Sequence, residues 1–295
     1  MPKVTVLMSV LNGEKYLRAA IDSITGQTFE DFEFVIIDNG STDETPNIIG
    51  SYTDPRIVCH RNAHPLTLTQ ALNQGLEIAQ GDLVARLDAD DIATPDRLKK
   101  QVDYLDRHPE IVLLGSNLQH FELDESGRIR HLDSPAMPCD HQEIFESLAS
   151  MNPVGHVTMM YRLKEVREVG GYPEHLIYAQ DLGLLHRLAH RHRFAALQDR
   201  LTLVRQHPDQ ISSQESWARI RLLEAISLFK DGIRLPGMTA VGKARGREGI
   251  AKCYFSMCRV DMRDGKWWSA LAGLIKGTVT SPSELYHRVF RSRSE

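Results

Sequence analysis

The sequence lacks several features that define specialised classes of protein. None of its apolar runs approaches the roughly 20 residues that a membrane-spanning helix requires. The start, Met1-Pro2-Lys3, leads directly into an apolar stretch, without the charged beginning and small-residue cleavage site of a signal peptide. The sequence also contains no internal repeat and no low-complexity tract. We therefore expect a globular, cytoplasmic protein.

Cysteine is scarce as well. The four cysteines form no C-x-x-C pair, and no histidine stands at zinc-ligand spacing from Cys253 and Cys258. Reduced, structural thiols are the expectation under cytosolic redox conditions. The 295 residues are 42% hydrophobic and 25% charged, as in an ordinary globular protein. Disulfide-rich and disordered classes are therefore disfavoured.

The net charge of −4 hides an asymmetry between the two parts of the chain. Residues 216–295 contain 15 Lys+Arg and 7 Asp+Glu, a net charge of +8. Residues 1–215 contain 20 Lys+Arg and 32 Asp+Glu, a net charge of −12. An acidic front and a basic tail suggest different partners for the two parts.

Strand and helix patterns alternate over the first hundred residues. Apolar, β-rich runs predict strands at 4–10, 32–38, 56–60 and 83–87. Apolar stripes predict helices at 14–24 and 68–80, a capping box at Ser41–Glu44 begins another, and Pro95 opens a fourth. This alternation predicts an α/β protein with a mostly parallel, twisted sheet that helices cover on both faces.

The pattern changes further along the chain. Residues 111–135 are typical of short strands, and helices are expected at 140–150, 163–169 and 180–192, with the histidines from His186 to His192 on a solvated face. After about residue 215 the segments are helical and basic. Gly, Pro and charge between residues 231 and 248 suggest a loose link.

Three acids follow the apolar run at 83–87. Asp88, Asp90 and Asp91 would repel one another unless water or a cation screens them. Hard cations such as Mg²⁺ or Mn²⁺ take oxygen ligands and share them with substrate phosphates. Ligands of such sheets bind beyond the carboxyl ends of the strands, where these acids and Asp38 are expected. A solvated acidic turn that caps the next helix is the alternative.

Several segments, in order along the chain, resemble family 2 glycosyltransferases, whose members have the GT-A fold. The resemblance covers residues 3–215, and an ordered series of motifs is more specific than any one of them. The segments that carry it are Val4–Asn12, Tyr16-Leu17, Gln27-Thr28-Phe29, Val35–Asp43, Arg61-Asn62, Ala71-Leu72-Asn73, Ala85–Asp91, Asn152-Pro153, His156, Thr158-Met159, Gly170-Gly171-Tyr172, Gln180-Asp181 and Arg187-Leu188-Ala189.

The resemblance implies a GT-A catalytic domain over residues 1–215. Residues 1–110 would form its Rossmann-like, nucleotide-sugar-binding half, residues 111–215 its acceptor half, and residues 216–295 a basic helical C-terminal region. It further implies a metal-dependent, inverting transfer of a hexosyl or N-acetylhexosaminyl group, of the kind used in bacterial polysaccharide biosynthesis. The expected donor is a UDP-sugar or, second, a dTDP-sugar, and the acceptor is a hydroxyl of a glycan or a lipid-linked saccharide. No nucleic-acid partner is expected.

The resemblance also assigns roles to particular residues. Asp90 would bind Mn²⁺ or Mg²⁺, and Asp88 would contact the metal and the ribose or donor sugar. Asp181 would be the general base, and His207 with Arg205 would approach the metal or diphosphate. The other donor-binding candidates are Ser9, Leu11, Asp38, Asn39, Asn62, Asn73, Arg86 and Ala89, and the residues expected around the site are Asp91, His156 and Gln180.

The assigned residues divide the work of a single displacement. A cation held by Asp90 stabilises the leaving diphosphate, and Asp181 removes the proton of the acceptor hydroxyl. One base without an enzymatic nucleophile inverts the anomeric configuration. From the residues alone, Asp181 could equally stabilise the dipole of a helix that begins there. Arg86 could neutralise the acidic cluster instead of contacting phosphate.

Three positions depart from the family pattern. Asn39 stands where an acid is frequent, and its amide can donate as well as accept, which weakens the inference of base preference. Leu11 replaces an aromatic residue that commonly stacks on the nucleotide base. Gln180 replaces a frequent Glu beside the general base, Asp181. These departures keep open a non-catalytic or weakly active nucleotide-sugar-binding protein on the same fold. A nucleotidyltransferase is a further alternative. It would require a Gly-rich, basic loop after the first strand, whereas Leu11-Asn12-Gly13-Glu14 has one glycine and an acid.

The basic tail contains an amphipathic segment. Trp267, Trp268, Leu271, Leu274 and Ile275 are apolar positions at helical spacing, and they are surrounded by Arg263, Lys266 and Lys276, with Arg288, Arg291 and Arg293 further on. Such a segment can bind an anionic membrane surface, which would place the protein peripherally on the inner face of the membrane. Packing of the tryptophans against the catalytic domain is the alternative, and both stay open.

Overall fold

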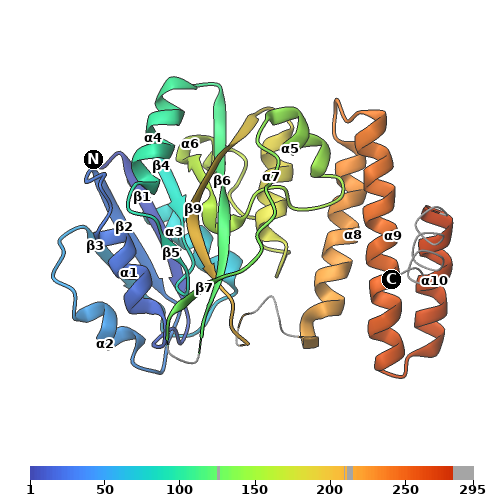
Figure 1. Cartoon of the computed structure of the whole chain (residues 1–295), viewed down its shortest axis with the longest axis horizontal. Helices are drawn as coiled ribbons and strands as arrows, with labels where there is room; N and C mark the ends of the chain where they lie inside the picture. The colour runs from blue at the N-terminus through green and yellow to red at the C-terminus, as the bar shows by residue number, and fades with distance from the viewer. Residues whose placement is uncertain (125–126, 209, 211–214, 282–295) are drawn as a thin grey trace. The chain divides into compact units, whose positions relative to one another are not determined.

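The computed structural model of the chain describes residues 1–124, 127–208, 210 and 215–281 (Figure 1). Two compact units are described separately below. The first comprises Met1–His141, Val154–Ile177 and Arg191–His207, and the second comprises Gln142–Pro153, Tyr178–His190 and Pro208–Glu295. The second unit therefore includes two segments that precede residue 215. The domain boundary at residue 215 and the subdivision at residue 110 stay predictions.

One nine-stranded sheet forms the centre of the first unit, with the order β3-β2-β1-β4-β8-β6-β9-β5 and β7 paired to β6. Strands β3, β2, β1 and β4 are parallel, β8 is antiparallel to β4 and β6, and β9 runs parallel to β6. The sheet is thus parallel in its first half and mixed beyond. The strands are β1 Val4–Val10, β2 Phe32–Asp38, β3 Ile57–Arg61, β4 Leu83–Arg86, β5 Ile92–Ala93, β6 Ile111–Leu123, β7 Ile129–His131, β8 Met160–Arg162 and β9 Arg193–Arg205.

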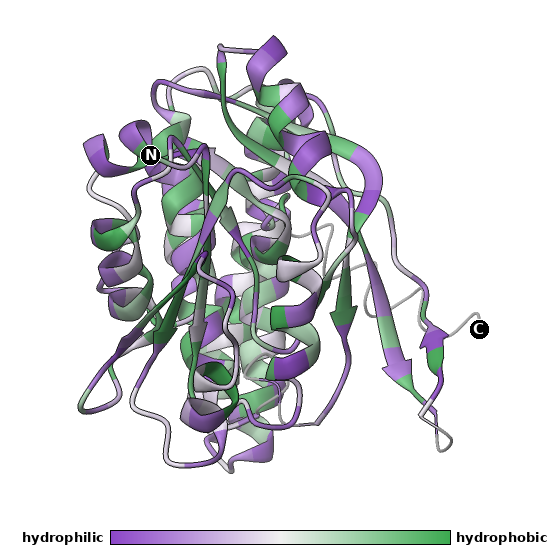
Figure 2. Ribbon diagram, turned by 90° about the vertical axis from the view of Figure 1, so that its left-hand side faces the viewer, coloured by the Kyte–Doolittle hydropathy of each residue, from purple (hydrophilic) through white to green (hydrophobic). Residues whose placement is uncertain are grey.

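Helices cover both faces of the sheet, as predicted. Helices α1 (Leu17–Thr25) and α4 (Arg97–Arg107) share one hydrophobic core with Val4, Val6 and Met8 of β1. Successive strand residues point to opposite faces, so Leu7 lies on the other side. There Gly75 of α3 (Leu68–Ile78) packs so closely on Leu7 that a Cβ would not fit. Figure 2 shows the hydrophobic colour along the central strands and mixed colour on the helices.

Two local predictions in the first unit were wrong. The capping box at Ser41–Glu44 does not form, and α2 spans only Thr45–Gly50. Ser41 Oγ instead accepts the backbone N–H of Asn12 (3.0 Å), because the side chain is used to join two loops. Strand β5 was not predicted, since two residues carry no periodic pattern; it exists through its pairing with β9. The remaining short helix of this unit is α6 (Leu163–Glu168).

The second unit is helical. It contains most of α5 (His141–Ser147), together with α7 (Gln180–Ala189), α8 (Ala218–Arg234), α9 (Ala240–Arg263) and α10 (Trp267–Thr280). Helix α9 packs between α8 and α10 (Figure 1). No helix in the described part of the chain is long and apolar enough to cross a membrane. Residues 282–295, including Arg288, Arg291 and Arg293, lie outside the described residues.

Two predictions about this unit were also wrong. Residues 231–248 are not a loose link, because α8 continues to Arg234 and α9 begins at Ala240. The glycines there allow close packing: a Cβ on Gly232 would lie 2.8 Å from the Ala149 Cα. His186 is not on a solvated face either. It is buried, and its Nε2 lies 3.1 Å from the Leu148 carbonyl oxygen, within hydrogen-bonding distance.

Candidate active site

The turn between β4 and β5 carries three aspartates. One carboxylate oxygen of each of Asp88, Asp90 and Asp91 lies within 4.8 Å of the others. The side chains of Asp88 and Asp90 are 36% and 30% exposed, whereas Asp91 is buried. Because β4 runs parallel to β1, and β1 to β2, the carboxyl ends of the three strands lie at one edge of the sheet. The acidic turn therefore occupies the edge at which such sheets bind ligands.

Burial and mutual repulsion disfavour the charged forms of two of these carboxyl groups. Burial, and then Asp88, raises the pKa of Asp90, although the hydrogen bond to His207 opposes this shift. Burial, with Asp88 and Asp90, raises the pKa of Asp91 well above its ordinary value. Carboxylate oxygens are the ligands that hard divalent cations prefer. The donor set therefore fits Mg²⁺ or Mn²⁺, with Asp88 and Asp90 accessible to it.

The end of β9 and the segment that follows it contact the acidic turn. Arg205 donates its backbone N–H to Asp91 Oδ1 (2.9 Å) and its Nε–H to the Asp90 carbonyl oxygen (3.0 Å). His207 Nε2 lies 2.9 Å from Asp90 Oδ2. The structure thus brings together two segments that are 114 residues apart in the chain, both of which the sequence assigned to the site.

Tyr16, which the sequence analysis did not assign to the site, packs beside this contact. Its ring centroid lies 4.6 Å from that of His207. The Arg205 guanidinium lies 4.6 Å from the centroid of Tyr16 and 4.7 Å from that of Phe121, within range of cation–π attraction. These contacts fix Arg205 and His207 relative to the acidic turn. Tyr16 stands in a motif that carried the family resemblance, but nothing in the sequence indicated its partner.

Two buried arginines lie behind the acidic turn. Arg86 is fully buried, and its guanidinium donates to the Asp88 carboxylate and to the Leu87 carbonyl oxygen. Arg97 of α4 donates from Nη2 to the Arg86 carbonyl oxygen (2.7 Å) and from Nε to Gln101 Oε1 (3.1 Å). Burial, and then Arg86, lowers the pKa of Arg97 to about 9, while Asp91 opposes the shift. Arg86 therefore orients Asp88 in the structure, and Arg97 holds the backbone of Arg86.

The residues predicted to bind the nucleotide base form polar contacts among the loops that follow β2 and β3. Asn39 is buried, its Oδ1 accepts from Asn62 Nδ2 (3.0 Å) and the Leu66 N–H (2.9 Å), and its Nδ2 donates to the Leu66 carbonyl oxygen (2.9 Å). Asp38 is also buried; its Oδ1 accepts the Ser41 N–H (2.9 Å) and its Oδ2 lies 3.2 Å from Arg61 Nε. These contacts shape the loops at the carboxyl end of β2. Direct contact with a base stays a prediction.

Two further loops are joined beside the end of β1. Asn12 has a left-handed backbone (φ 53°), and its Oδ1 accepts the Thr42 N–H (2.9 Å). Leu11 is 46% exposed there, while Ser9 on β1 and Ala89 in the acidic turn are half-buried. Positions 9, 11 and 89 therefore lie at or next to the ends of neighbouring strands, and their contact with a donor stays a prediction.

Asn73 is placed by contacts with a distant segment of the chain. Its Oδ1 accepts the Tyr172 N–H (2.8 Å), and its Nδ2 donates to the Tyr172 carbonyl oxygen (2.9 Å). The Tyr172 hydroxyl lies 2.9 Å from His156 Nε2 and 3.1 Å from the Tyr161 hydroxyl. Burial, and then the charge of Arg86, lowers the pKa of His156 to about 3, so its imidazole is neutral. Asn73 and His156 belong to this hydrogen-bonded network; donor binding by Asn73 stays a prediction.

The predicted general base lies in the second unit. Asp181 is in the first turn of α7, and its Oδ2 accepts from Asn152 Nδ2 (2.6 Å). Gln180 beside it is buried, and its Oε1 has no hydrogen-bond partner among the described residues. Asn152 orients the carboxylate, a role that the sequence analysis did not assign to it. Convergence of Asp181 with the acidic turn stays a prediction, because the two lie in different units.

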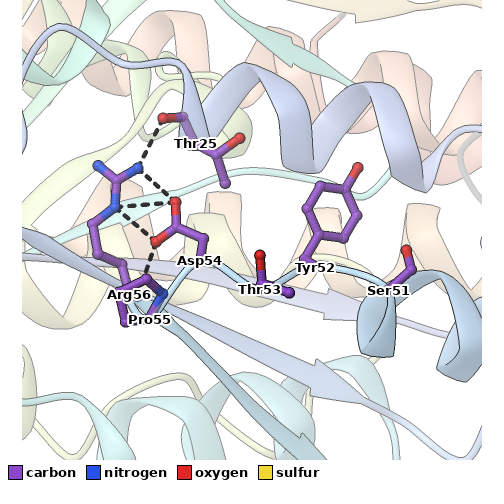
Figure 3. Close-up of a pocket in the computed structure, with 7 residues that line it drawn as sticks. All are labelled: Thr25, Ser51, Tyr52, Thr53, Asp54, Pro55 and Arg56. Atoms are coloured by element: carbon purple, nitrogen blue, oxygen red, sulfur yellow. Dashed lines mark hydrogen bonds and ion pairs between the residues drawn. The ribbon is translucent and has the colours of Figure 1, made fainter.

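A surface hollow of the first unit lies elsewhere. It is lined by Thr25 and the segment Ser51–Arg56, at the amino end of β3 (Figure 3). Figure 3 shows the Arg56 guanidinium bound to Asp54 and to the Thr25 carbonyl oxygen. The acids of the candidate site are at the opposite, carboxyl ends of the strands. We therefore assign this hollow no part in the site.

A sheet with a parallel half, an acidic turn at its strand ends and a helical C-terminal region is typical of GT-A glycosyltransferases. The family model for "Glycosyl transferase family 2" matches residues 5–169. The amylovoran biosynthesis glycosyltransferase AmsE of Erwinia amylovora is 32% identical over 223 residues, which cover 74% of this chain and 81% of the relative. The chain therefore belongs to glycosyl transferase family 2.

Solved structures agree on the fold. The S. aureus TarS 1–349 structure in complex with UDP-GlcNAc has a TM-score of 0.64 and 18% identity, and the match covers 97% of this chain and 91% of TarS 1–349. The mannosyltransferase PcManGT of Pyrobaculum calidifontis, in complex with GDP-Man and Mn²⁺, has a TM-score of 0.63 and 17% identity, with 99% and 82% covered. The GT-A fold that the sequence resemblance implied is confirmed.

Proposed function

We propose that the protein is a metal-dependent, inverting glycosyltransferase that moves a hexosyl or N-acetylhexosaminyl group from a nucleotide-diphosphate sugar to a hydroxyl. A UDP-sugar is the first choice of donor and a dTDP-sugar the second. The observation that carries the proposal is the contact of Asp90 with His207 at the carboxyl ends of the parallel strands. The UDP-GlcNAc bound by TarS, which has the same fold, supports the choice of donor.

The metal would be held by Asp90, with Asp88 and His207 as further ligands. When bound, Mn²⁺ or Mg²⁺ supplies Lewis-acid stabilisation for the diphosphate that departs. The chain itself keeps these ligands in place: Arg86 binds Asp88, and Arg205 binds the backbone of Asp90. Ligands fixed in this way need little reorganisation when a donor binds.

The donor would lie against the joined loops at the ends of β1 and β2. Ser9, Leu11 and Ala89 are the candidates for direct contact, while Asp38 and Asn39 shape the surface beneath the base. The side chain of Asn39 already forms three hydrogen bonds to the loop that follows β3. The backbone groups of these loops would therefore select the nucleotide base. Such selection is compatible with Asn39 at a position where the family often has an acid, because a change of side chain leaves the backbone donors and acceptors unchanged.

Asp181 would remove the proton of the acceptor hydroxyl. Its carboxylate is half-buried, and the hydrogen bond from Asn152 Nδ2 (2.6 Å) orients it. Direct attack by the acceptor gives single displacement and inversion. A glycan or a lipid-linked saccharide fits such a reaction, because each offers an alcohol.

The first test is a transfer assay with Asp181→Asn. We expect the turnover number to fall by about 10²- to 10⁴-fold, the usual contribution of a general base, with nucleotide affinity nearly unchanged. Glu143→Gln is the matched control, because Glu143 is an exposed acid in the first turn of α5. Full activity of Asp181→Asn would refute the assignment.

The same assay separates the rival functions. Release of the nucleoside diphosphate with sugar on the acceptor supports a glycosyltransferase, whereas pyrophosphate release indicates a nucleotidyltransferase. Nuclear magnetic resonance of the product gives the anomeric configuration, and retention would contradict single displacement. Absence of both transfer and slow donor hydrolysis, despite tight donor binding, would indicate a non-catalytic binding protein.

A further inference from the structure

Helix α10 packs on α9, and the positions that it buries are all small residues. Its buried positions are Ala270, Gly273 and Gly277. A Cβ on Gly273 would lie 3.3 Å from the Tyr254 carbonyl oxygen, and one on Gly277 would lie 2.8 Å from the Phe255 ring. The small side chains therefore let the two helices approach closely. All large apolar residues of α10 consequently lie on its other sides.

The side of α10 that faces away from α9 is apolar and exposed. Trp268, Leu271, Ile275 and Val279 follow one another at helical spacing and are 85%, 46%, 56% and 77% exposed. Trp267 extends the same surface at 65% exposure. A helix on the surface of a globular protein normally turns its polar side to water. This helix does the reverse, so its outer face is an apolar surface that none of the described residues covers.

Lysines border this apolar face. Helix α10 contains no Asp or Glu, and its one charged residue is Lys276. Lys266 precedes Trp267 directly and lies in an exposed ion pair with Asp264 (3.2 Å), a kind of contact that water and lipid headgroups readily replace. The sequence from 216 to 295 has a net charge of +8. An apolar face bordered by lysines complements an anionic surface and repels a second copy of itself.

We propose that the outer face of α10 docks on an anionic lipid bilayer. The paired tryptophans would lie among the headgroups, because indole rings favour the membrane interface, and Leu271, Ile275 and Val279 would enter the acyl boundary. Lys266 and Lys276 would contact anionic phosphate. This partner goes beyond the proposed transfer reaction. Packing of the tryptophans against another part of the chain, the alternative that the sequence left open, is an outcome of the test below.

The test uses the full chain and vesicles of phosphatidylglycerol mixed with phosphatidylcholine, with pure phosphatidylcholine vesicles for comparison. Sedimentation with the anionic vesicles is expected, weakening as salt rises. A Trp217→Phe background leaves Trp267 and Trp268 as the only tryptophans, since the chain has three. In that background, bromine-labelled lipids are expected to quench most of the fluorescence.

Variants test whether vesicle binding depends on this face of α10 or on non-specific adsorption. Trp267→Ser with Trp268→Ser is expected to weaken vesicle binding by at least about tenfold. Lys266→Gln with Lys276→Gln is expected to weaken it by about tenfold or more at low salt. Val241→Ser is the matched control, an exposed apolar residue of α9 whose loss should leave binding unchanged. Transfer to a soluble acceptor should persist in all of these variants, so failure of docking and failure of the proposed reaction are distinguishable.

Three results would overturn the proposal. Equal vesicle binding by the wild type and the double tryptophan variant would show that another surface binds. A dimer in sedimentation equilibrium that the tryptophan variant disperses, without any vesicle binding, would make the face an interface between copies. Fluorescence that is protected from aqueous quenchers before lipid is added would show that another segment of this chain covers the tryptophans.

Discussion

Arg97 is a cation placed where water cannot reach it. It is fully buried on the first turn of α4, and it donates hydrogen bonds to the Arg86 and Met159 carbonyl oxygens and to Gln101. Loss of a buried, hydrogen-bonded charge leaves its partners unsatisfied, which costs more than the lost contact itself. Arg97 thus supports Arg86, which in turn orients Asp88. We therefore infer that Arg97 stabilises the acidic turn, although these hydrogen bonds go to none of the three carboxylates.

Arg97→Ala is therefore expected to lower the free energy of unfolding by about 3 kcal/mol. Urea titration followed by circular dichroism measures it. Arg107→Ala provides the comparison, because Arg107 is an exposed arginine of the same helix and its loss should change stability by only about 0.5 kcal/mol. Equal effects of the two substitutions would contradict the role given to Arg97.

The position of Asp88 and Asp90 at a strand end was predictable from sequence, whereas that of the arginines behind them was only partly so. Asp88 and Asp90 follow an apolar strand, and a position at a strand end is visible in a linear pattern. The spacing of Arg97 and Gln101, four residues apart beside the apolar stripe of α4, could have indicated a buried polar pair. The contact of Arg205 and His207 with the turn was expected only through family resemblance. No local pattern connects residues 114 positions apart.

At the scale of elements, glycines decide how the helices of the second unit pack. A Cβ on Gly249 of α9 would lie 2.9 Å from the Ser150 Cα and 3.0 Å from its carbonyl oxygen. Those are backbone atoms, which cannot move aside as a flexible side chain can. Composition alone suggested a flexible link in this part of the sequence. Glycine has two uses, chain flexibility and close approach, and only the tertiary contacts distinguish them.

Gly249→Ala and Gly50→Ala are expected to act in opposite directions. Alanine favours a helix by about 1 kcal/mol over glycine, and Gly50 of α2 has open space around it, so Gly50→Ala should stabilise by roughly 0.5 kcal/mol. At Gly249 the added Cβ would push α9 away from the backbone of Ser150, and this should outweigh the gain. We expect the free energy of unfolding to fall by about 2 kcal/mol. Thermal unfolding followed by circular dichroism gives both signs. Stabilisation by Gly249→Ala would show that α9 does not pack closely there.

Elements with a strong apolar pattern were predicted well, and the others were not. Strands β1 and β2 have the bounds that their apolar runs predict, and the buried stripe of α1 contains the residues that its helical spacing indicates. The start of α2 was wrong because Ser41 bonds across to Asn12, a contact between residues far apart in the chain. A strand as short as β5 forms only through its pairing with β9, and this pairing exists only in the folded chain.

At the scale of the whole molecule, ligands should stabilise the protein in a defined order. A ligand that binds only the folded state adds RT ln(1 + [L]/Kd), about 2.7 kcal/mol at a hundredfold excess over Kd. We expect the unfolding temperature to rise with UDP-sugars most, with dTDP-sugars less and with GDP-sugars least, and Mn²⁺ to enlarge each rise because it bridges acid and diphosphate. A panel of these donors with and without Mn²⁺ measures it.

Asp90→Asn should remove the part of this stabilisation that Mn²⁺ adds, and leave a smaller, metal-independent shift from the nucleotide. Asp103→Asn is the control, because Asp103 is an exposed acid of α4 paired only with Lys99 among the described ion pairs. A full Mn²⁺ response in Asp90→Asn would move the metal to other ligands. A response to donors that never depends on Mn²⁺ would mean that the buried arginines alone balance the turn, since Arg86 and Arg97 already place two positive charges behind its three acids.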